Sequence, residues 1–151
     1  MVKHVEANMI EGLSHVTFIV KDLVKTKYML EYLFNAKEVY SSDGNDFSIF
    51  SEKFFQVGNL WIAIMESEKK VLNRTYNHIA FKINEKDYDE YLKKINDLNL
   101  EIKSARPRVD GEGLSIYFYD YDNHLFELHT GTLEERLNRY LGDSPHKITP
   151  K

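Results

Sequence analysis

The sequence predicts an α+β fold of two tandem βαβββ modules whose sheets form a metal-binding cup. Two segments, 12–20 and 75–83, are rich in β-branched and aromatic residues, and each carries a histidine near its start. A charged turn and a stretch of helical periodicity follow each segment. Further short β-prone runs complete each copy, which indicates an internal repeat of one strand–helix–strand–strand–strand unit.

Composition and charge exclude several classes of partner. The 151 residues are enough for one domain or two small fused modules, and 42% hydrophobic residues are enough for a core. A net charge of −4 does not indicate binding to nucleic acid or to a membrane surface. No apolar run approaches the length of a membrane span. The sequence therefore predicts no nucleic-acid partner and no membrane partner.

The lack of cysteine and the character of the N-terminus indicate a cytoplasmic protein. The chain contains 0 cysteines, so no disulfide holds the fold and no thiolate serves as nucleophile or ligand. Residues 1–11 lack the basic start and apolar centre of a signal peptide. We therefore expect a cytoplasmic location.

The first module is expected at 12–66, after a polar N-terminal arm at 1–11. Asp22 fits the N-cap of its helix, because a short side-chain oxygen can accept from the first free backbone N–H groups. Gly58 and Asn59 mark a turn. The expected elements are strands at 13–20, 36–41, 47–50, 54–57 and 60–65, a helix at 25–34, and a turn at 43–46.

The second module is expected at 76–131, after a charged linker at 67–75. Apolar residues recur at helical spacing between 87 and 98, and a helix at 132–141 begins with two acidic residues that suit a helix N-terminus. A polar tail at 142–151 ends the chain. The remaining expected elements are strands at 76–83, 100–103, 115–119 and 124–129, and a basic glycine-containing loop at 104–113.

Two histidines and one glutamate form the candidate metal site. His15 and His78 occupy equivalent points of the two copies, and Glu127 lies within an apolar strand. A buried unpaired carboxylate costs several kcal/mol, so a metal or an arginine must compensate it. Two imidazoles and one carboxylate leave open coordination positions, as a catalytic metal requires. His129 shares the face of Glu127 and could be the ligand in its place.

Strand alternation places other polar side chains on the faces of these ligands. Thr17 shares the face of His15, and Tyr76 shares that of His78. Trp61 could lie in the core or line the site. His124 falls on the opposite face, at a turn, where we expect a structural role. His4 and His146 lie near the chain ends, and Ser115, Tyr117 and Tyr119 lie together on one strand.

The repeat with His15, His78 and Glu127 resembles the vicinal oxygen chelate superfamily, and within it the fosfomycin resistance proteins. The resemblance covers about residues 9–141. Their C-terminal signature resembles segments 115–120, 122–129 and 131–133 together with Arg136. Segments 51–55 and 74–78 resemble the FosX type, which hydrolyses the drug.

The resemblance implies a metal-dependent epoxide hydrolase that confers resistance to fosfomycin. Fosfomycin is a small epoxide that bears a phosphonate. Mn(II), or another divalent metal, would be held by His15, His78 and Glu127 and would act as a Lewis acid. Glu52 would act as the catalytic base that takes a proton from water. From the residues alone a solvent-facing turn glutamate is favoured, and only the resemblance of its flanking residues reverses this. The product would be a vicinal diol phosphonate.

The resemblance also implies residues that bind the anionic phosphonate. Tyr76 is added to this set by strand alternation. Related proteins place a cation in the loop that here contains Arg108. Arg136 could instead be an exposed partner of Glu134 or Glu135, which would contribute little. The contacts implied by resemblance are Thr17, Trp61, Ser115, Tyr117 and Arg136.

Related proteins are homodimers in which the first module of one subunit pairs with the second module of its partner. A module-exchanged homodimer would build each site from both chains. Two alternative functions remain open within this fold. The first is transfer of a thiol, glutathione or bacillithiol, to fosfomycin. The second is metal-free drug binding, as in bleomycin-resistance proteins. A ring-cleaving dioxygenase is less favoured, because nothing in the sequence demands Fe(II) or an aromatic substrate.

Overall fold

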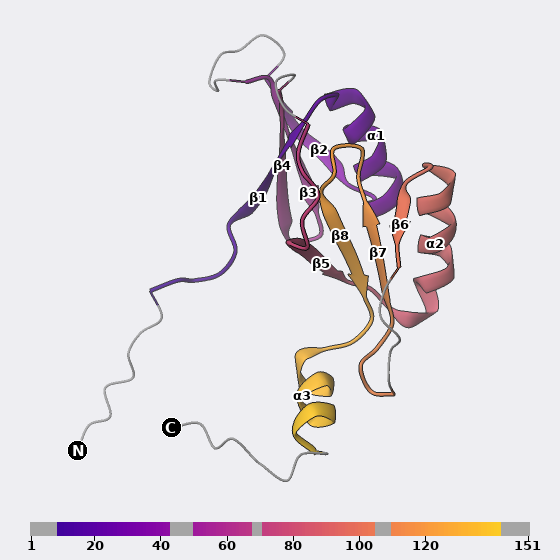
Figure 1. The fold of residues 1–151 in the computed structure, drawn as a ribbon. Coiled ribbons are helices and arrows are strands. Elements are labelled where there is room, and N and C mark those ends of the chain that lie inside the picture. The colour runs from indigo at the N-terminus through magenta and orange to yellow at the C-terminus, as the bar shows by residue number, and fades with distance from the viewer. Residues whose placement is uncertain (1–8, 43–49, 68–70, 105–109, 143–151) are drawn as a thin grey trace, which may run out of the picture. The chain divides into compact units, whose positions relative to one another are not determined.

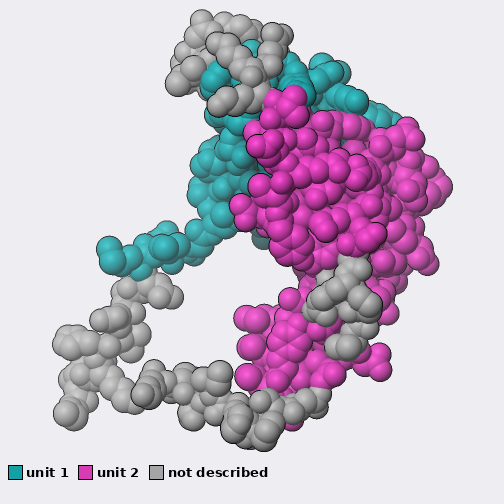
Figure 2. Space-filling view, in the orientation of Figure 1, with its two compact units in different colours: residues 1–67 teal, residues 68–151 magenta. Residues whose placement is uncertain are grey.

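The computed structural model describes residues 9–42, 50–67, 71–104 and 110–142 of the chain. The chain divides into two compact units, Met1–Ser67 and Glu68–Lys151, which Figure 2 shows in teal and magenta. Within the described ranges, no helix is long and apolar enough to cross a membrane. The predicted module bounds of 12–66 and 76–131 stay a prediction.

The first unit contains one helix and one four-stranded sheet with the strand order β1-β4-β3-β2 (Figure 1). Strand β1 pairs parallel with β4, and β3 pairs antiparallel with both β4 and β2. The first and last strands of the unit are therefore neighbours at the edge that carries His15. The elements are β1 (His15–Val20), α1 (Leu23–Phe34), β2 (Lys37–Ser41), β3 (Glu52–Val57) and β4 (Leu60–Glu66).

The second unit repeats this topology with the strand order β5-β8-β7-β6. Strand β5 pairs parallel with β8, and β7 pairs antiparallel with β8 and β6. A C-terminal helix, α3, is added after the last strand. The elements are β5 (His78–Lys82), the short 3-10 helix η1 (Glu85–Asp87), α2 (Tyr88–Asp97), β6 (Glu101–Lys103), β7 (Ser115–Tyr119), β8 (Leu125–His129) and α3 (Leu133–Gly142).

One face of each sheet is buried under a helix. In the first unit, α1 packs on β3 and β4, where Phe55, Ile62 and Ile64 are fully buried. In the second, Phe118 and Phe126 stack with ring centroids 5.4 Å apart, and Ile95 of α2 is also fully buried. Burying such large apolar side chains is the dominant favourable contribution to folding. Strand alternation then turns the histidines and Glu127 to the opposite faces.

Local signals in the sequence account for the helix ends. The side chain of Asp22 accepts a hydrogen bond from the backbone N–H of Lys25 at 2.9 Å, which confirms the predicted N-cap. At the C-terminal end of α1, Asn35 adopts the left-handed conformation with φ of 52°. Helix α3 begins at a capping box. Thr132 and Glu135 exchange backbone-to-side-chain hydrogen bonds of 2.7 and 3.2 Å.

The predicted fold class of two βαβββ modules is confirmed, with corrections to element bounds. Glu52 does not lie between two strands but begins β3, since its N–H and C=O bond Ser42. The helix expected at 87–98 is a 3-10 turn followed by α2. The predicted turn at 43–46, most of the strand at 47–50, residues 105–109 of the loop, most of the N-terminal arm and most of the tail lie outside the described residues.

Candidate metal centre

The strand register of the second sheet collects polar side chains around Glu127. Glu127 stands opposite Ala80 of β5 and opposite Tyr117 of β7. His129 stands opposite Ser115, two residues further along the same face. Because residues that pair across neighbouring strands share a face, these side chains and His78 project from one side of the sheet.

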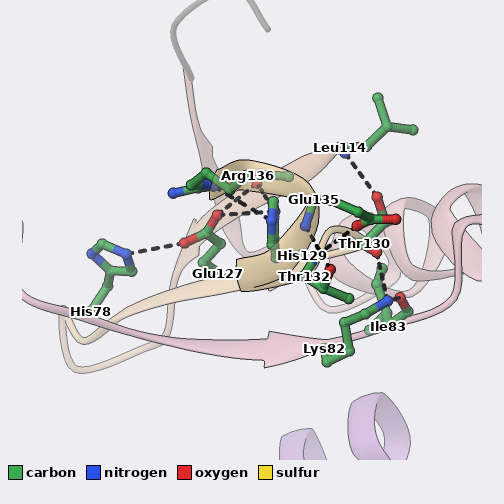
Figure 3. A network of polar contacts seen from close by, with 11 residues as sticks. His78, Lys82, Ile83, Leu114, Glu127, His129, Thr130, Thr132, Glu135 and Arg136 are labelled. Carbon is green, nitrogen blue, oxygen red and sulfur yellow. Dashed lines mark hydrogen bonds and ion pairs between the residues drawn. The ribbon is translucent and has the colours of Figure 1, made fainter. Parts of the chain in front are cut away.

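His78 and Glu127, two of the predicted metal ligands, lie in contact with each other. The Nε2 atom of His78 lies 3.0 Å from Oε2 of Glu127 (Figure 3). The other ring nitrogen, Nδ1, lies 2.8 Å from the backbone carbonyl oxygen of Tyr76. A carbonyl oxygen only accepts, so Nδ1 carries the proton and Nε2 of the neutral ring presents a lone pair.

The donor set of this pair fits a divalent cation. A lone pair that faces a carboxylate oxygen at this distance is unfavourable unless a shared proton or a metal ion satisfies both atoms. Metal-bound imidazoles usually donate their other N–H to a backbone carbonyl or a carboxylate, as His78 does. The geometry therefore supports coordination through Nε2 of His78 and Oε2 of Glu127.

Glu127 is held in its ionised form although it is only 5% exposed. Burial alone raises the pKa of its carboxyl group. Hydrogen bonds from Ser115 and Tyr117, and the positive charge that His129 and His78 can carry, lower this pKa, and the net pKa lies below its ordinary value. An ionised carboxylate is the form that binds a metal.

A chain of polar contacts leads from Arg136 on α3 to Glu127. The Nη2 atom of Arg136 lies 3.4 Å from Nε2 of His129. Nδ1 of His129 lies 2.8 Å from the hydroxyl oxygen of Ser115. That hydroxyl donates to Oε1 of Glu127 at 2.6 Å. Figure 3 shows Arg136, His129 and Glu127 turned toward one another above the strand.

Aromatic rings surround the imidazole of His78. Tyr76 and Tyr117 contact it edge to face, with ring centroids at 5.2 and 5.5 Å, and the two tyrosines stack at 6.2 Å. Tyr76 is 64% exposed, whereas Tyr117 is buried. These rings restrict the rotation of the His78 imidazole. The imidazole is reached from solvent on the side of the exposed Tyr76 ring.

In the first unit, His15 lies against Trp61. The two residues pair across β1 and β4, and their rings are 4.2 Å apart at an interplanar angle of 31°. Trp61 is 38% exposed, so its alternative placement in the core is wrong. Nδ1 of His15 lies 3.1 Å from the hydroxyl of Ser14. Thr17 follows on the same exposed face.

Glu52 lies on the same face of the first sheet as His15. It pairs with Met65, which pairs with Ile19, and Ile19 shares the face of His15 by strand alternation. Glu52 is only 6% exposed. The alternative of a solvent-facing turn glutamate is therefore wrong, because Glu52 begins a strand and its side chain is shielded from bulk water.

The predicted site residues are thus divided between the two units. His78 and Glu127 lie together in the second unit, while His15 and Glu52 lie in the first. Within the described residues, no group of three histidine, aspartate or glutamate side chains comes together in a complete metal site. His124 pairs with Asp120 at 2.6 Å in the β7–β8 turn, as expected of a structural histidine. Arg108 lies outside the described residues.

A comparison with protein families covers nearly the whole folded part. Residues 12–128 match the model of the Glyoxalase/Bleomycin resistance protein/Dioxygenase superfamily. The chain belongs to this superfamily. It is also 61% identical over 132 residues to the fosfomycin resistance protein FosX of Listeria monocytogenes. The aligned residues make up 87% of this chain and 98% of the relative. This identity assigns it to the fosfomycin resistance proteins.

Solved structures and a more distant relative complete the comparison. A mutant of Listeria monocytogenes FosX, in complex with Mn(II) and 1S,2S-dihydroxypropylphosphonic acid, matches with a TM-score of 0.81 and 60% identity, covering 87% of this chain and 100% of that chain. The metallothiol transferase FosB of Staphylococcus saprophyticus is 36% identical over 141 residues, or 91% of this chain and 89% of the relative.

Two features near the candidate metal ligands were missed in the sequence. Thr132 and Glu135 form a capping box that orients α3, and their Thr-x-x-Glu spacing was a readable signal. Gly131 gives space to His129, since a Cβ at residue 131 would lie 2.7 Å from its Nε2. No sequence signal marks that glycine, because the close approach depends on tertiary packing.

Proposed function

We propose that the protein is a Mn(II)-dependent hydrolase that opens the epoxide of fosfomycin with water. The product is the vicinal diol phosphonate, and the reaction confers resistance to the drug. The observation that carries the proposal is the pairing of His78 Nε2 with Glu127 Oε2, on a chain 61% identical to FosX. The binding of Mn(II) and a diol phosphonate by a structural relative supports it.

His15, His78 and Glu127 would hold the metal. When bound, a divalent cation supplies Lewis-acid stabilisation of the negative charge that develops on the epoxide oxygen. The carbonyl oxygen of Tyr76 fixes the tautomer of His78, and the hydroxyl of Ser115 fixes the carboxylate of Glu127. Both contacts prepare the ligands before the substrate arrives.

Glu52 would act as the general base. It would take a proton from water as the water oxygen attacks the epoxide carbon that bears phosphorus. The carbon–oxygen bond of the epoxide breaks, its oxygen takes a proton from solvent water to become the second hydroxyl, and Glu52 returns its proton to solvent. The burial of Glu52 at the start of β3 supports this role, because it keeps the carboxylate apart from bulk water on the face that carries His15.

The phosphonate would be bound by hydroxyls and cations near the ligands. Ser115, Tyr117 and Arg136 lie around Glu127, and Arg136 has several N–H donors for an anion. The hydroxyls of Ser115 and Tyr117 donate to Glu127 and would have to turn toward the phosphonate to bind it. Thr17 and Trp61 lie beside His15 on the open face of β1 and β4. Tyr76 and Arg108 complete the proposed set.

A module-exchanged homodimer would bring the two groups of ligands together. His15 and Glu52 of one subunit would meet His78 and Glu127 of the other, giving two equivalent sites on a two-fold axis. The division of these residues between two compact units is compatible with this assembly. We place the protein in the cytoplasm as part of the same proposal, since a cysteine-free chain needs no oxidising compartment.

Transfer of a thiol to fosfomycin is the second candidate, favoured by the 36% identity to a metallothiol transferase. Phosphorus NMR of fosfomycin incubated with protein and Mn(II) separates the two. We expect the diol signal without any thiol, no conversion after metal removal by a chelator, and recovery best with Mn(II). A product that forms only with glutathione or bacillithiol would replace hydrolysis with thiol transfer. Full activity without metal would contradict the metal role.

A further inference from the structure

We propose that His129 is a positioning residue for Glu127, acting through the hydroxyl of Ser115 rather than as a metal ligand. The inference rests on the proposed function, because it assumes that Glu127 binds the metal. It gives His129 a role that needs no coordination of the metal.

The first step is that both nitrogens of His129 already have polar neighbours. Nδ1 lies 2.8 Å from Oγ of Ser115 and 3.6 Å from Oε1 of Glu127, so the hydroxyl is its nearer partner. Nε2 lies 3.4 Å from Nη2 of Arg136. A guanidinium group only donates, so Nε2 accepts from Arg136. The neutral ring then carries its proton on Nδ1 and donates it to Ser115.

The second step is the direction that this donation gives to Ser115. A hydroxyl has one proton to donate and lone pairs to accept with. Since the Ser115 oxygen accepts from His129, its proton is directed to Oε1 of Glu127 at 2.6 Å. The carboxylate is thereby held by one oxygen, and its other oxygen, Oε2, is turned to Nε2 of His78.

The third step is that the imidazole fits a confined space. A Cβ added at Gly131 would lie 2.7 Å from Nε2 and 3.2 Å from Cε1 of His129, and 2.9 Å from the backbone oxygen of Glu112. The side chain of His129 is only 15% exposed. The ring therefore has little freedom to turn, and the hydrogen-bond chain is built into the fold.

The test measures Mn(II) affinity of the full-length protein without fosfomycin, from the electron paramagnetic resonance signal of free Mn(II). His129→Leu removes both polar ends. His129→Asn keeps a donor near the position of Nδ1, and His129→Gln keeps only the end that faces Arg136. Loss of a hydrogen-bonding partner of a metal ligand typically costs about 10–100-fold in affinity. We expect that loss for His129→Leu and His129→Gln, and near wild-type affinity for His129→Asn.

A double-mutant cycle with Ser115→Ala shows whether His129 acts through the hydroxyl. In the Ser115→Ala background, His129→Leu should weaken Mn(II) binding no further. The control is His124→Leu, since His124 precedes the same strand but pairs with Asp120. It should keep the affinity of the wild type, with the melting temperature of every metal-free variant recorded alongside.

Several results would overturn the inference. Independent, additive losses for His129→Leu and Ser115→Ala would remove the route through the hydroxyl. An equal loss for His129→Asn and His129→Leu would show that a donor at the Nδ1 position is not what His129 supplies. An equal loss for His124→Leu would show that the effect is not specific to His129. If the wild-type protein bound no Mn(II), the proposed function would fail together with this inference, whereas additive losses would leave that function intact.

Discussion

At the scale of single residues, the site depends on side chains that are fixed by their neighbours before any ligand binds. His78 is held by the Tyr76 carbonyl and by two tyrosine rings, and Glu127 is held by Ser115. Preorganised groups need little rearrangement on binding, so more of the interaction energy appears as affinity. Substitutions near these residues should therefore change the affinity of the site for its metal.

Gly131→Ala should damage the site by contact with His129. The added Cβ would meet Nε2 at 2.7 Å and the backbone oxygen of Glu112 at 2.9 Å. Overpacking of this kind costs about 1–3 kcal/mol of the free energy of unfolding. Urea denaturation and Mn(II) titration measure the two effects. Gly142→Ala is the matched control, because nothing lies within 4 Å of its added Cβ. Equal stability of the two variants would contradict this account of Gly131.

At the scale of secondary-structure elements, the sequence predicted most strands and helices because their apolar residues follow the correct period. β1, β4 and β5 were found within one or two residues, and Asp22 was recognised as the cap of α1. The start of β3 at Glu52 was missed. Its backbone pairs with Ser42 across the segment 43–51, and such nonlocal pairing leaves no periodic signal.

The candidate ligands could be named from the sequence because a histidine recurs at equivalent points of a repeat. The choice between Glu127 and His129 could not be made, since both lie on one strand face. The contacts with Ser115 and Arg136, from which we propose different roles for the two residues, cross between elements. The stacking of Trp61 on His15 likewise follows from the pairing of β1 with β4, which depends on chain topology.

The capping box of α3 should position Arg136 for the substrate. Thr132→Ala removes the hydroxyl that accepts from the Glu135 N–H, and the loss of such a cap costs about 0.5–2 kcal/mol. We expect a lower free energy of unfolding in urea and a higher KM for fosfomycin. Thr132→Ser keeps the hydroxyl and should restore both values. If the serine variant behaves like the alanine variant, the cap is not the cause.

At the scale of the whole molecule, the proposed assembly predicts complementation between inactive variants. His15→Ala and Glu127→Ala should each abolish hydrolysis of fosfomycin. In a module-exchanged heterodimer both defects can fall in one composite site, which leaves the other site intact. Mixing and refolding the two variants should therefore restore part of the activity. Refolding each variant alone is the control.

A lack of complementation would count against the exchange of modules between subunits. If each site were built from a single chain, every site of the mixed dimer would carry one defect. Heterodimers demonstrated by mass spectrometry, but without any recovered activity, would show that the modules are not exchanged. Hydrolysis by a single-chain site would then require a different partner for His78 and Glu127.

The measurement that tests the central claim most directly is the single-turnover rate of diol formation by Glu52→Gln in water enriched with oxygen-18. The substitution keeps size and hydrogen bonding but removes basicity, and a positioned general base contributes about 10²–10⁴-fold. We predict a rate lower by about this factor, with Mn(II) content and fosfomycin binding unchanged, and wild-type product labelled at the carbon attached to phosphorus. A wild-type rate in Glu52→Gln, or loss of its Mn(II), would contradict the assignment of Glu52 as the base.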